Sequence, residues 1–361
     1  MTFSRASSSL VRLQSQSLIK RQVQRRLATV ASSDSSASSS TSATTTTTWK
    51  PPIDPGVEPA YDEALKFISE QSSQLKKELV TLKSEVEAAP LNSPERALAE
   101  ARLYSTSIAS QINDPEVRWK FKHDSNVPLS NPVYAHLREK IWREKTLPRL
   151  LERSRLMRVV PGICTSIVPM VDVQVAFGEG SGIHDHGGEA GDVTVGCFVD
   201  ANKSVDEPKI TITPFHTEER LYTLALVDLD APEPEHDRLS TYALWLAHNV
   251  PLSLTKTQVK VTPEQVSLSY IPPHPQNGTK YHRYGLILLE QDQSNIISPA
   301  EDIERKGFSI PQLIERYPLL SPKGLHFWRA QWSQESSKAI SKVYKDILQM
   351  KEPVFLSELA Q

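Results

Sequence analysis

The stretch from residue 221 to residue 290 constrains the fold of this chain more than any other part. Apolar runs of strand length alternate there with short polar or proline-containing segments. Three such segments, residues 228–232, 244–249 and 277–284, open or close an apolar run. In the first of them, Pro232 fixes a turn that presents Asp228 and Asp230 at the end of a strand. The pattern predicts a β-rich domain in which polar side chains gather at strand ends.

Other parts of the chain from residue 161 onward also show strand patterns. Apolar residues alternate at Val171, Val173, Val175 and Phe177, and again at Ile210 and Ile212; further strands are expected at 193–199, 221–227, 242–247, 266–271 and 284–289. Helical spacing returns only at 310–317 and 334–350. The elements predict a fold that is mainly β with α, in which the helices come late.

A long amphipathic helix is expected upstream, over residues 61–88. Its apolar seam has spacings of three and four residues and consists of Leu65, Ile68, Ser72, Leu75, Leu79, Leu82 and Val86. Such a seam needs a partner. A second helix that begins after Ser93 and runs to about Ile112 is one candidate, and another protein is the other. The sequence leaves both open.

The first 33 residues have the composition of a mitochondrial transit peptide. They contain six basic residues (Arg5, Arg12, Lys20, Arg21, Arg25 and Arg26), many serines, and no acidic residue before Asp34. Cleavage after Leu27 would follow the Arg25–Arg26 pair, and a disordered basic tail is the alternative. Residues 28–50 form a Ser/Thr-rich segment that is expected to be a disordered linker. The sequence has no apolar run of 18 residues, so we expect no membrane span.

Charge and cysteine content limit the classes of partner. Removing the leader leaves 35 basic residues from 41 against 43 acidic residues, a net charge of −8. A chain with that balance is not a general polyanion binder, so any contact with RNA must be local. Cys164 and Cys197 are the only cysteines, and a reducing compartment gives no reason to pair them.

The basic residues concentrate between residues 136 and 158. They are Arg138, Lys140, Arg143, Lys145, Arg149, Arg153, Arg155 and Arg158, against Glu139, Glu144 and Glu152. Arginine forks suit phosphate contacts, so these eight residues are candidates for binding the phosphates of an RNA. The alternative is an amphipathic helix that packs on the neighbouring domain and keeps its charges in water.

The three segments of the 221–290 stretch resemble the ligand-pocket signature of the phosphatidylethanolamine-binding protein family. Residues 305–308, 317–319 and 327–332 look like the family's closing segment, in order and at plausible spacing. The resemblance covers roughly residues 165–335 and implies a β-fold domain of this family over 161–335. An α-helical extension over 51–160 would precede that domain, and a C-terminal helix and tail over 336–361 would follow it.

The resemblance implies that Asp228, Asp230, His282 and Tyr284 line a small pocket for an anionic head group, with Trp245 beneath them. Several positions depart from the family's pattern. Leu244 stands in place of a histidine, Leu229 in place of a proline, and Pro272, His274 and Lys280 in place of glycines. An apolar side chain cannot bind a phosphate oxygen, and side chains at glycine positions obstruct a ligand. We therefore expect a remnant pocket without a small-molecule ligand, whose polar residues form a satisfied core network.

A second candidate site lies between residues 178 and 196. His184, His186 and Glu189 nearly reproduce the first metal motif of the cupin family, although the spacing is one residue short. The second cupin motif is not found, and the glycines and acids there suit a surface loop. The sequence also lacks a nucleophile elbow, a dinucleotide loop and a Walker motif. We therefore predict no metal, no cofactor and no enzymatic activity.

A leader, a helical extension, a basic segment and an altered pocket need one explanation. Together they resemble the subunits of this family that belong to the large subunit of the mitochondrial ribosome. The resemblance implies a structural constituent of its central protuberance in the mitochondrial matrix, with ribosomal RNA and neighbouring proteins, and no DNA, as partners. The rival readings are a matrix protein that binds phospholipid or another anion, and a metal-dependent enzyme of cupin type.

Overall fold

The computed structural model describes residues 49–124, 127–178, 191–236, 238–300 and 302–355. Contacts divide the chain into a unit of residues 1–50 and a compact unit from Pro51 to Gln361, which holds every helix and strand described below. The predicted transit peptide and nearly all of the predicted linker lie outside the described residues. Among the residues that are described, no helix combines the length and the apolar character that crossing a membrane requires.

The N-terminal part of the compact unit contains three helices, α2 (Pro59–Ala88), α3 (Pro94–Ala109) and α4 (Pro115–His123). Each helix has proline in its first turn, where the missing N–H costs no hydrogen bond. The side chain of Ser93 caps α3 and that of Asp114 caps α4. Helix α4 has no counterpart in the sequence-based prediction.

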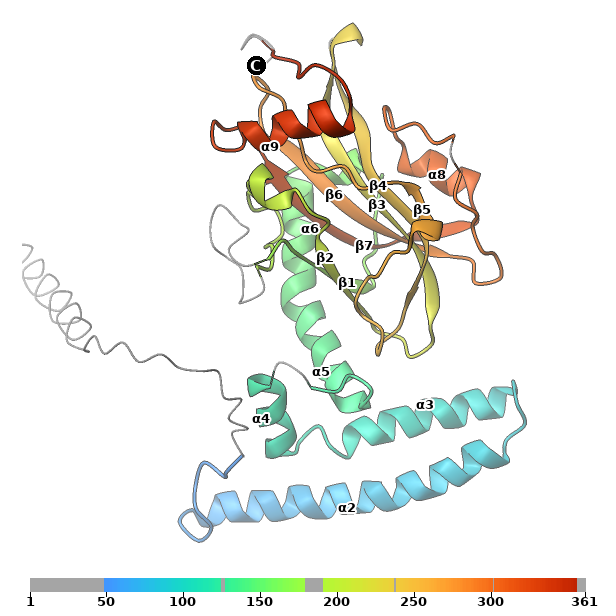
Figure 1. Ribbon diagram of the computed structural model, residues 1–361. Helices are drawn as coiled ribbons and strands as arrows, with labels where there is room; N and C mark the ends of the chain where they lie inside the picture. The colour runs from blue at the N-terminus through green and yellow to red at the C-terminus, as the bar shows by residue number, and fades with distance from the viewer. Residues whose placement is uncertain (1–48, 125–126, 179–190, 237, 301, 356–361) are drawn as a thin grey trace, which may run out of the picture. The chain divides into compact units, whose positions relative to one another are not determined.

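The seam of α2 faces α3, so the two helices form a hairpin (Figure 1). All seven seam residues are half-buried or buried, and Leu82 is the most buried of them. The hydroxyl of Ser72 donates to the carbonyl oxygen of Ser110 beyond the end of α3, at 2.7 Å. Of the two partners that the sequence leaves open for this seam, the structure thus provides the one within the chain.

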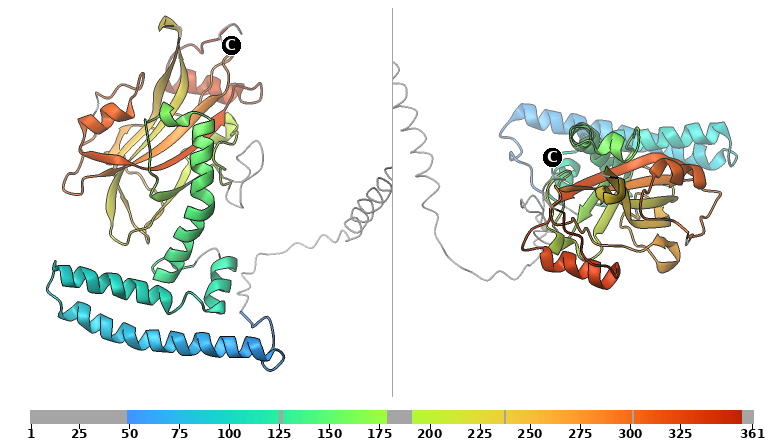
Figure 2. Two further views of the ribbon diagram at one scale, coloured as in Figure 1. Left: turned by 180° about the vertical axis from the view of Figure 1, so that it is seen from behind. Right: turned by 90° about the horizontal axis from the view of Figure 1, so that it is seen from above.

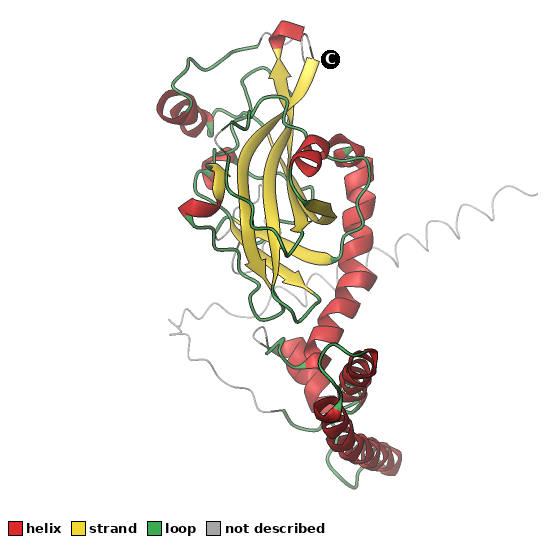
Figure 3. Cartoon of the chain, turned by 90° about the vertical axis from the view of Figure 1, so that its right-hand side faces the viewer, coloured by secondary structure: helices red, strands yellow, loops and turns green. Residues whose placement is uncertain are grey.

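The basic segment lies on a nearly continuous helix. Helix α5 (Pro132–Ile141) passes through a π-helical turn (Trp142–Thr146) into α6 (Leu147–Leu156), and a short α7 (Val159–Gly162) follows. The ring of Trp142 is 1% exposed and lies 5.1 Å from that of Phe215, and Leu150 is buried in the core. The helix is therefore anchored along one side, and Figure 3 shows it running alongside the sheet.

The main sheet has five antiparallel strands in the order β5-β4-β3-β6-β7. They are β3 (Arg220–Glu233), β4 (Arg238–Leu252), β5 (Val266–Leu268), β6 (His282–Gln291) and β7 (Leu319–Ala330). A second sheet pairs β1 (Val171–Ala176) with β2 (Lys209–Pro214). Short 3-10 turns cover Ala201–Ser204, Pro234–His236 and Pro263–Gln265.

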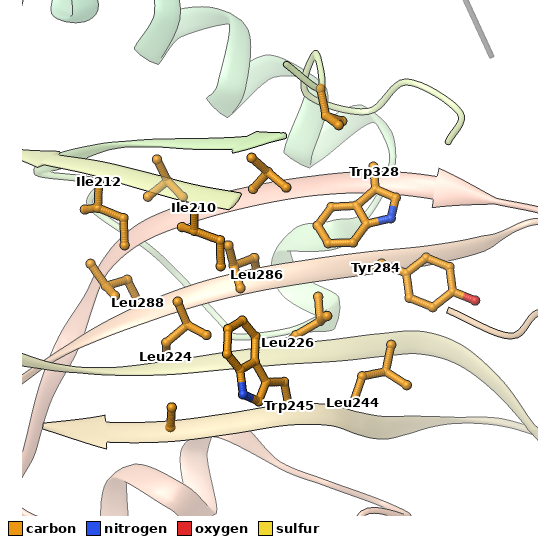
Figure 4. Close-up of a cluster of buried hydrophobic side chains, with 14 of the residues drawn as sticks. Ile210, Ile212, Leu224, Leu226, Leu244, Trp245, Tyr284, Leu286, Leu288 and Trp328 are labelled. Atoms are coloured by element: carbon orange, nitrogen blue, oxygen red, sulfur yellow. The ribbon is translucent and has the colours of Figure 1, made fainter. Parts of the chain in front are cut away.

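Both faces of the five-stranded sheet are buried, which explains the continuous apolar runs of β3 and β6. Leu224 and Leu286 point to the face covered by β1 and β2, in the cluster drawn in Figure 4. Their neighbours Ala225 and Ile287 point to the opposite face, where Leu150 of α6 packs. The view from behind shows α6 crossing this second face (Figure 2). The predicted fold class, a β-domain of this type with late helices behind a helical extension, is confirmed.

Several strand predictions differ from the structure. Strand β3 continues to Glu233 through the turn predicted at Pro232, with a register shift between Asp228 and Ala231, and β4 is longer than predicted at both ends. Residues 193–199 form no strand, because Gly196 has a φ of +75° and leaves only single bridges, such as that between Phe198 and Arg329. The expected strand at 266–271 is shorter and ends at Leu268. Strand β7 was not predicted, since its Ser-Pro-Lys-Gly stretch resembles a turn in sequence.

The C-terminal part contains α8 (Ile310–Arg316), α9 (Ser337–Lys342) and a π-helical turn (Val343–Ile347). The chain then reaches the loop that precedes β6, where the N–H of Phe355 donates to the carbonyl oxygen of Asn277 at 2.9 Å. Gly278 makes this approach possible, because a Cβ there would overlap the carbonyl oxygen of Phe355.

Replacing Gly278 with alanine is expected to detach the C-terminal tail. Gly278 has a φ of +90°, and Gly56 has a φ of +88° with nothing within 4 Å of its added Cβ. Both substitutions carry a backbone cost of roughly 1–2 kcal/mol, so Gly56→Ala is a matched control for strain alone. We expect Gly278→Ala to accelerate tryptic cleavage at the exposed Lys351, and Gly56→Ala to leave that rate unchanged. Equal rates in both variants would contradict the contact.

Candidate functional site

The centre of the remnant pocket is a buried pair between Asp228 of β3 and His282 of β6. Nδ1 of His282 lies 2.8 Å from Oδ2 of Asp228, and the two side chains are 1% and 5% exposed, respectively. The other carboxylate oxygen accepts the backbone N–H of Asp230 at 2.8 Å. Both oxygens of Asp228 are therefore hydrogen-bonded inside the chain.

The surroundings of His282 fit a protonated ring. The hydroxyl of Thr279 donates to the carbonyl oxygen of Gln276 and lies 2.9 Å from Nε2 of His282. Because a hydroxyl has a single proton, Nε2 is left to donate to it while Nδ1 donates to Asp228. Burial lowers the pKa of His282, but the charge of Asp228 and the hydrogen bond to it outweigh burial and raise the pKa above its usual value. The raised pKa and the two hydrogen-bond acceptors favour the protonated form of His282 in this pair.

The remaining pocket residues lie among aromatic and apolar side chains. The ring of Tyr284 is fully buried between those of His282 and Trp328, with centroid distances of 6.3 and 6.1 Å. Burial, followed by the charge of Asp228, raises the pKa of Tyr284, so its hydroxyl stays protonated. In Figure 4, Leu244 and Tyr284 belong to the same apolar cluster, on strands β4 and β6 with β3 between them. A leucine there supplies packing and no hydrogen-bond donor to an anion.

Trp245 lies apart from the polar group. It packs edge-on against Tyr270 at 5.8 Å and belongs to the same apolar cluster as Leu224 and Leu226. The structure therefore brings together Asp228, His282 and Tyr284, and it places Trp245 in the sheet core.

Side chains of the chain itself surround the Asp228–His282 pair. His274, at a position where the family has glycine, is 7% exposed and packs between Tyr242 and Tyr344 at 5.9 and 5.4 Å. It interacts electrostatically with Asp228 and His282, although burial is the main cause that lowers its pKa. Tyr344, which follows α9, brings the C-terminal segment into the same group. The loop and the C-terminal segment thus contribute bulk where the family has a cavity.

Asp230 is paired with Arg283 in a bidentate contact. Its two oxygens lie 2.8 Å from Nε and 2.7 Å from Nη2 of Arg283, and it also accepts the backbone N–H of Arg283. Nη1 of Arg283 donates to the carbonyl oxygens of Met157 and Arg158, both at 2.8 Å, just beyond the end of α6. One arginine therefore joins β3, β6 and α6, and the second pocket carboxylate has a structural partner.

The basic helix divides into engaged and free cations. Arg138 contacts Asp172 at 3.3 Å, Lys140 contacts Glu144 at 4.0 Å, and Arg143 contacts Glu139 at 2.7 Å. Arg153 donates to the carbonyl oxygen of Val195. Lys145, Arg149, Arg155 and Arg158 are exposed and form no ion pair within the described part of the chain. The free cations thus lie on the π-helical turn, on α6 and just after α6. Helix α6 also packs on the sheet, as the alternative interpretation requires.

Sequence reasoning missed Arg283 and Arg329, which are Cα partners on β6 and β7. Both stand one position from a pocket or core residue, and strand alternation turns them toward α6. The alternation along the strands could have predicted toward which face the two arginine side chains turn. It could not have predicted their partners, because Met157 and Gly196 are far away in the sequence.

His184, His186 and Glu189 lie outside the described residues, so their arrangement stays a prediction. Among the residues that the structure does describe, no three His, Cys, Asp or Glu side chains are grouped so that they could hold a metal ion.

Comparison with known proteins supports a relationship over most of the chain. The large ribosomal subunit protein mL38 of Schizosaccharomyces pombe is 30% identical over 298 residues, which cover 80% of this chain and 90% of that protein. The chain belongs to the mL38 family. The match with the mL38 protein is longer than the pocket domain and takes in much of the helical extension as well.

A phosphatidylethanolamine-binding protein family model matches residues 176–316, within the β-domain of this mL38 family member. The protein MOTHER of FT and TFL1 homolog 2 of Oryza sativa subsp. japonica is 28% identical over 134 residues, or 37% of this chain and 66% of that protein. A solved phosphatidylethanolamine-binding protein from Plasmodium vivax covers 50% of this chain and 97% of its own, at 20% identity and a TM-score of 0.40.

Proposed function

We propose that this chain is a structural constituent of the large subunit of the mitochondrial ribosome and that it supports mitochondrial translation. The observation that carries the proposal is the 30% identity to the mL38 protein over 80% of the chain. A relationship through the pocket domain alone would leave the function open, because one fold hosts many functions. The mitochondrial matrix as its location agrees with the predicted transit peptide at residues 1–27. The position in the central protuberance rests on the family resemblance.

The state of the pocket supports a role without a small ligand. Asp228 is bound to His282 and Asp230 to Arg283, and these contacts are buried or nearly so. A phosphorylated head group would have to compete with a buried ion pair, and it would meet Leu244 where a donor is needed. The proposal therefore includes no ligand, no cofactor and no enzymatic activity.

Partners are neighbouring proteins of the large subunit and ribosomal RNA. The free cations Lys145, Arg149, Arg155 and Arg158 support RNA contact, because they have no carboxylate partner among the described residues and stand on an anchored helix. The net charge of −8 after removal of the leader means that any contact with RNA is local and depends on basic patches of the surface.

Purification of the tagged chain from mitochondria tests the function. After magnesium depletion has separated the ribosomal subunits, large-subunit RNA and proteins are expected to co-purify with it, and small-subunit RNA is not. Recovery of neither RNA, or of both in equal amounts, would contradict the proposal.

Charge reversal tests the part that the basic helix plays. Changing Lys145, Arg149 and Arg155 to glutamate is expected to abolish incorporation into the large subunit, because phosphate repulsion replaces attraction. The matched control changes the exposed Lys260, Lys306 and Lys338 in the same way, and normal incorporation is expected. If both variants are incorporated normally, the basic helix does not make the proposed RNA contacts.

A further inference from the structure

A second group of basic and aromatic side chains lies next to the basic helix and the remnant pocket, on β7, in the loop before β6 and in the loop around Phe198. It consists of Phe198, Lys280, Tyr281 and Arg329, which we call the Arg329 platform, and it adjoins Arg153 and Arg158. We propose that this platform binds single-stranded RNA, with a base stacked on Tyr281 and phosphates at Lys280, Arg158 and Arg329. The proposal rests on the proposed function and adds a specific nucleotide contact to it.

The platform is built by stacking around one guanidinium group. The Cζ atom of Arg329 lies 4.1 Å from the centre of the Phe198 ring and 5.2 Å from that of Tyr281. The two rings meet edge to face at 5.7 Å, and Nε of Arg329 donates to the carbonyl oxygen of Gly196 at 2.9 Å. The arginine is therefore held in place through its Nε, which leaves the outer nitrogens for an anion.

Arg153 stands next to this arrangement. Its Nη1 donates to the carbonyl oxygen of Val195, which precedes the Gly196 that holds Arg329. One short loop thus fixes two arginines, one from α6 and one from β7. Arg158, the last of the free cations, lines the same cavity as Lys280 and Tyr281, so a polyanion bound at Arg158 would reach the platform.

Tyr281 also faces a groove beside the platform. A cavity of about 800 Å³ is lined by Arg158, Lys280 and Tyr281, by Leu156 and the tip of the β3–β4 hairpin, and by the pocket residues Asp230, His282 and Arg283. Tyr281 is 41% exposed and Leu156 is 74% exposed, so aromatic and apolar surface is open to a partner. Bases stack on such surfaces whatever their sequence.

The acidic side chains near the groove form ion pairs with basic side chains, so the remaining unpaired charges around the groove are positive. Asp230 is paired with Arg283, and Glu233 with Arg238 at 2.6 Å and with His236. In the described part of the chain, Arg158, Lys280 and Arg329 form no ion pair. Lys280 further stands at a position where the family has glycine, which places a cation at the rim of the groove. Cations around an exposed aromatic ring fit RNA better than an acidic peptide, which would not use the ring face.

Binding of the full chain to a 5′-fluorescein-labelled oligouridine of 12 nucleotides, measured by anisotropy at several salt concentrations, tests the proposal. Tyr281→Ala is expected to weaken binding by roughly 5- to 100-fold, because it removes one stacked base, with the salt dependence unchanged. Tyr281→Phe keeps the ring and is expected to bind like the original chain. Lys280→Ala is expected to lower the slope of log K against log salt concentration by about 0.7, the value for one phosphate contact to a single strand.

Matched controls are Tyr104→Ala, a tyrosine of α3 that is 39% exposed, and the exposed Lys260→Ala. Neither is expected to change affinity or slope, and unfolding midpoints check that all variants are folded. Equal binding of the original chain and the Tyr281 and Lys280 variants would overturn the proposal. So would binding of an oligoglutamate peptide, in place of the RNA, that depends on the same residues. The proposed function would survive either result if the chain still co-purifies with large-subunit RNA.

Discussion

Replacing His282 with alanine is expected to lower the free energy of unfolding by about 3–5 kcal/mol, the cost of leaving a buried charge without its partner. The Asp228 side chain is 5% exposed, so water cannot replace the imidazolium that lies 2.8 Å from it. Urea denaturation of the original chain and the variant measures the difference. The control His236→Ala removes a histidine whose side chain is 58% exposed, and we expect no change in the midpoint. A loss as small as that of the control would show that the pair does not support the fold.

The raised pKa of His282 determines how the stabilisation by the Asp228–His282 pair changes with pH. Burial lowers this pKa, but Asp228 raises it by more, so the folded protein holds the proton more tightly than the unfolded chain does. The stabilisation is complete below the unfolded pKa of about 6.5 and is lost as the pH rises through the folded-state pKa. The difference in the free energy of unfolding between the original chain and the His282→Ala variant is therefore expected to be larger near about pH 6 than near about pH 9. The opposite trend would mean that the histidine is neutral.

Replacing Arg283 with alanine is expected to cost a similar amount, about 3–5 kcal/mol, because the nearly buried Asp230 would lose its ion-pair partner and keep only the backbone N–H of residue 283. The two carbonyl oxygens beyond the end of α6 would also lose their donor. Arg283→Lys keeps the charge but not the fork, so we expect an intermediate loss. Thermal and urea unfolding measure both variants.

Arg238→Ala is the matched control for Arg283→Ala, since it breaks an arginine–glutamate contact whose arginine is exposed. We expect that variant to unfold like the original chain. Hydrogen exchange provides a second test of Arg283→Ala, because the amides near Met157 and Arg158 are expected to lose protection first. Unchanged exchange there would show that the arginine does not hold the end of α6.

The sequence predicted the β-domain because its central strands have apolar residues on both faces, as Leu224 and Ala225 illustrate. It did not reveal β7, since Pro322 and Gly324 interrupt the strand pattern. In the structure the ladder shifts register beside Leu289, and the missing Cβ of Gly324 admits Val171 and Val173 of β1. A break in the local pattern is thus compensated by a contact that no local pattern contains.

In the candidate site, too, local motifs predicted some contacts, and contacts between residues distant in the sequence were missed. The motifs around Asp228 and His282 predicted that these residues would meet, and Leu244 indicated an altered pocket. The sequence did not indicate that Arg283 would bind Asp230 and the end of α6, because Met157 lies 126 residues away. The split of the basic segment into paired and free cations depended equally on distant carboxylates, such as that of Asp172 for Arg138.

Sedimentation of a mitochondrial lysate on sucrose gradients at low and high salt, with blotting for this chain, tests the central claim most directly. An integral constituent is expected to migrate with the large ribosomal subunit in both salts, since burial between neighbours protects its contacts from screening. Recovery at the top of both gradients, with the large subunit intact below, would contradict the account.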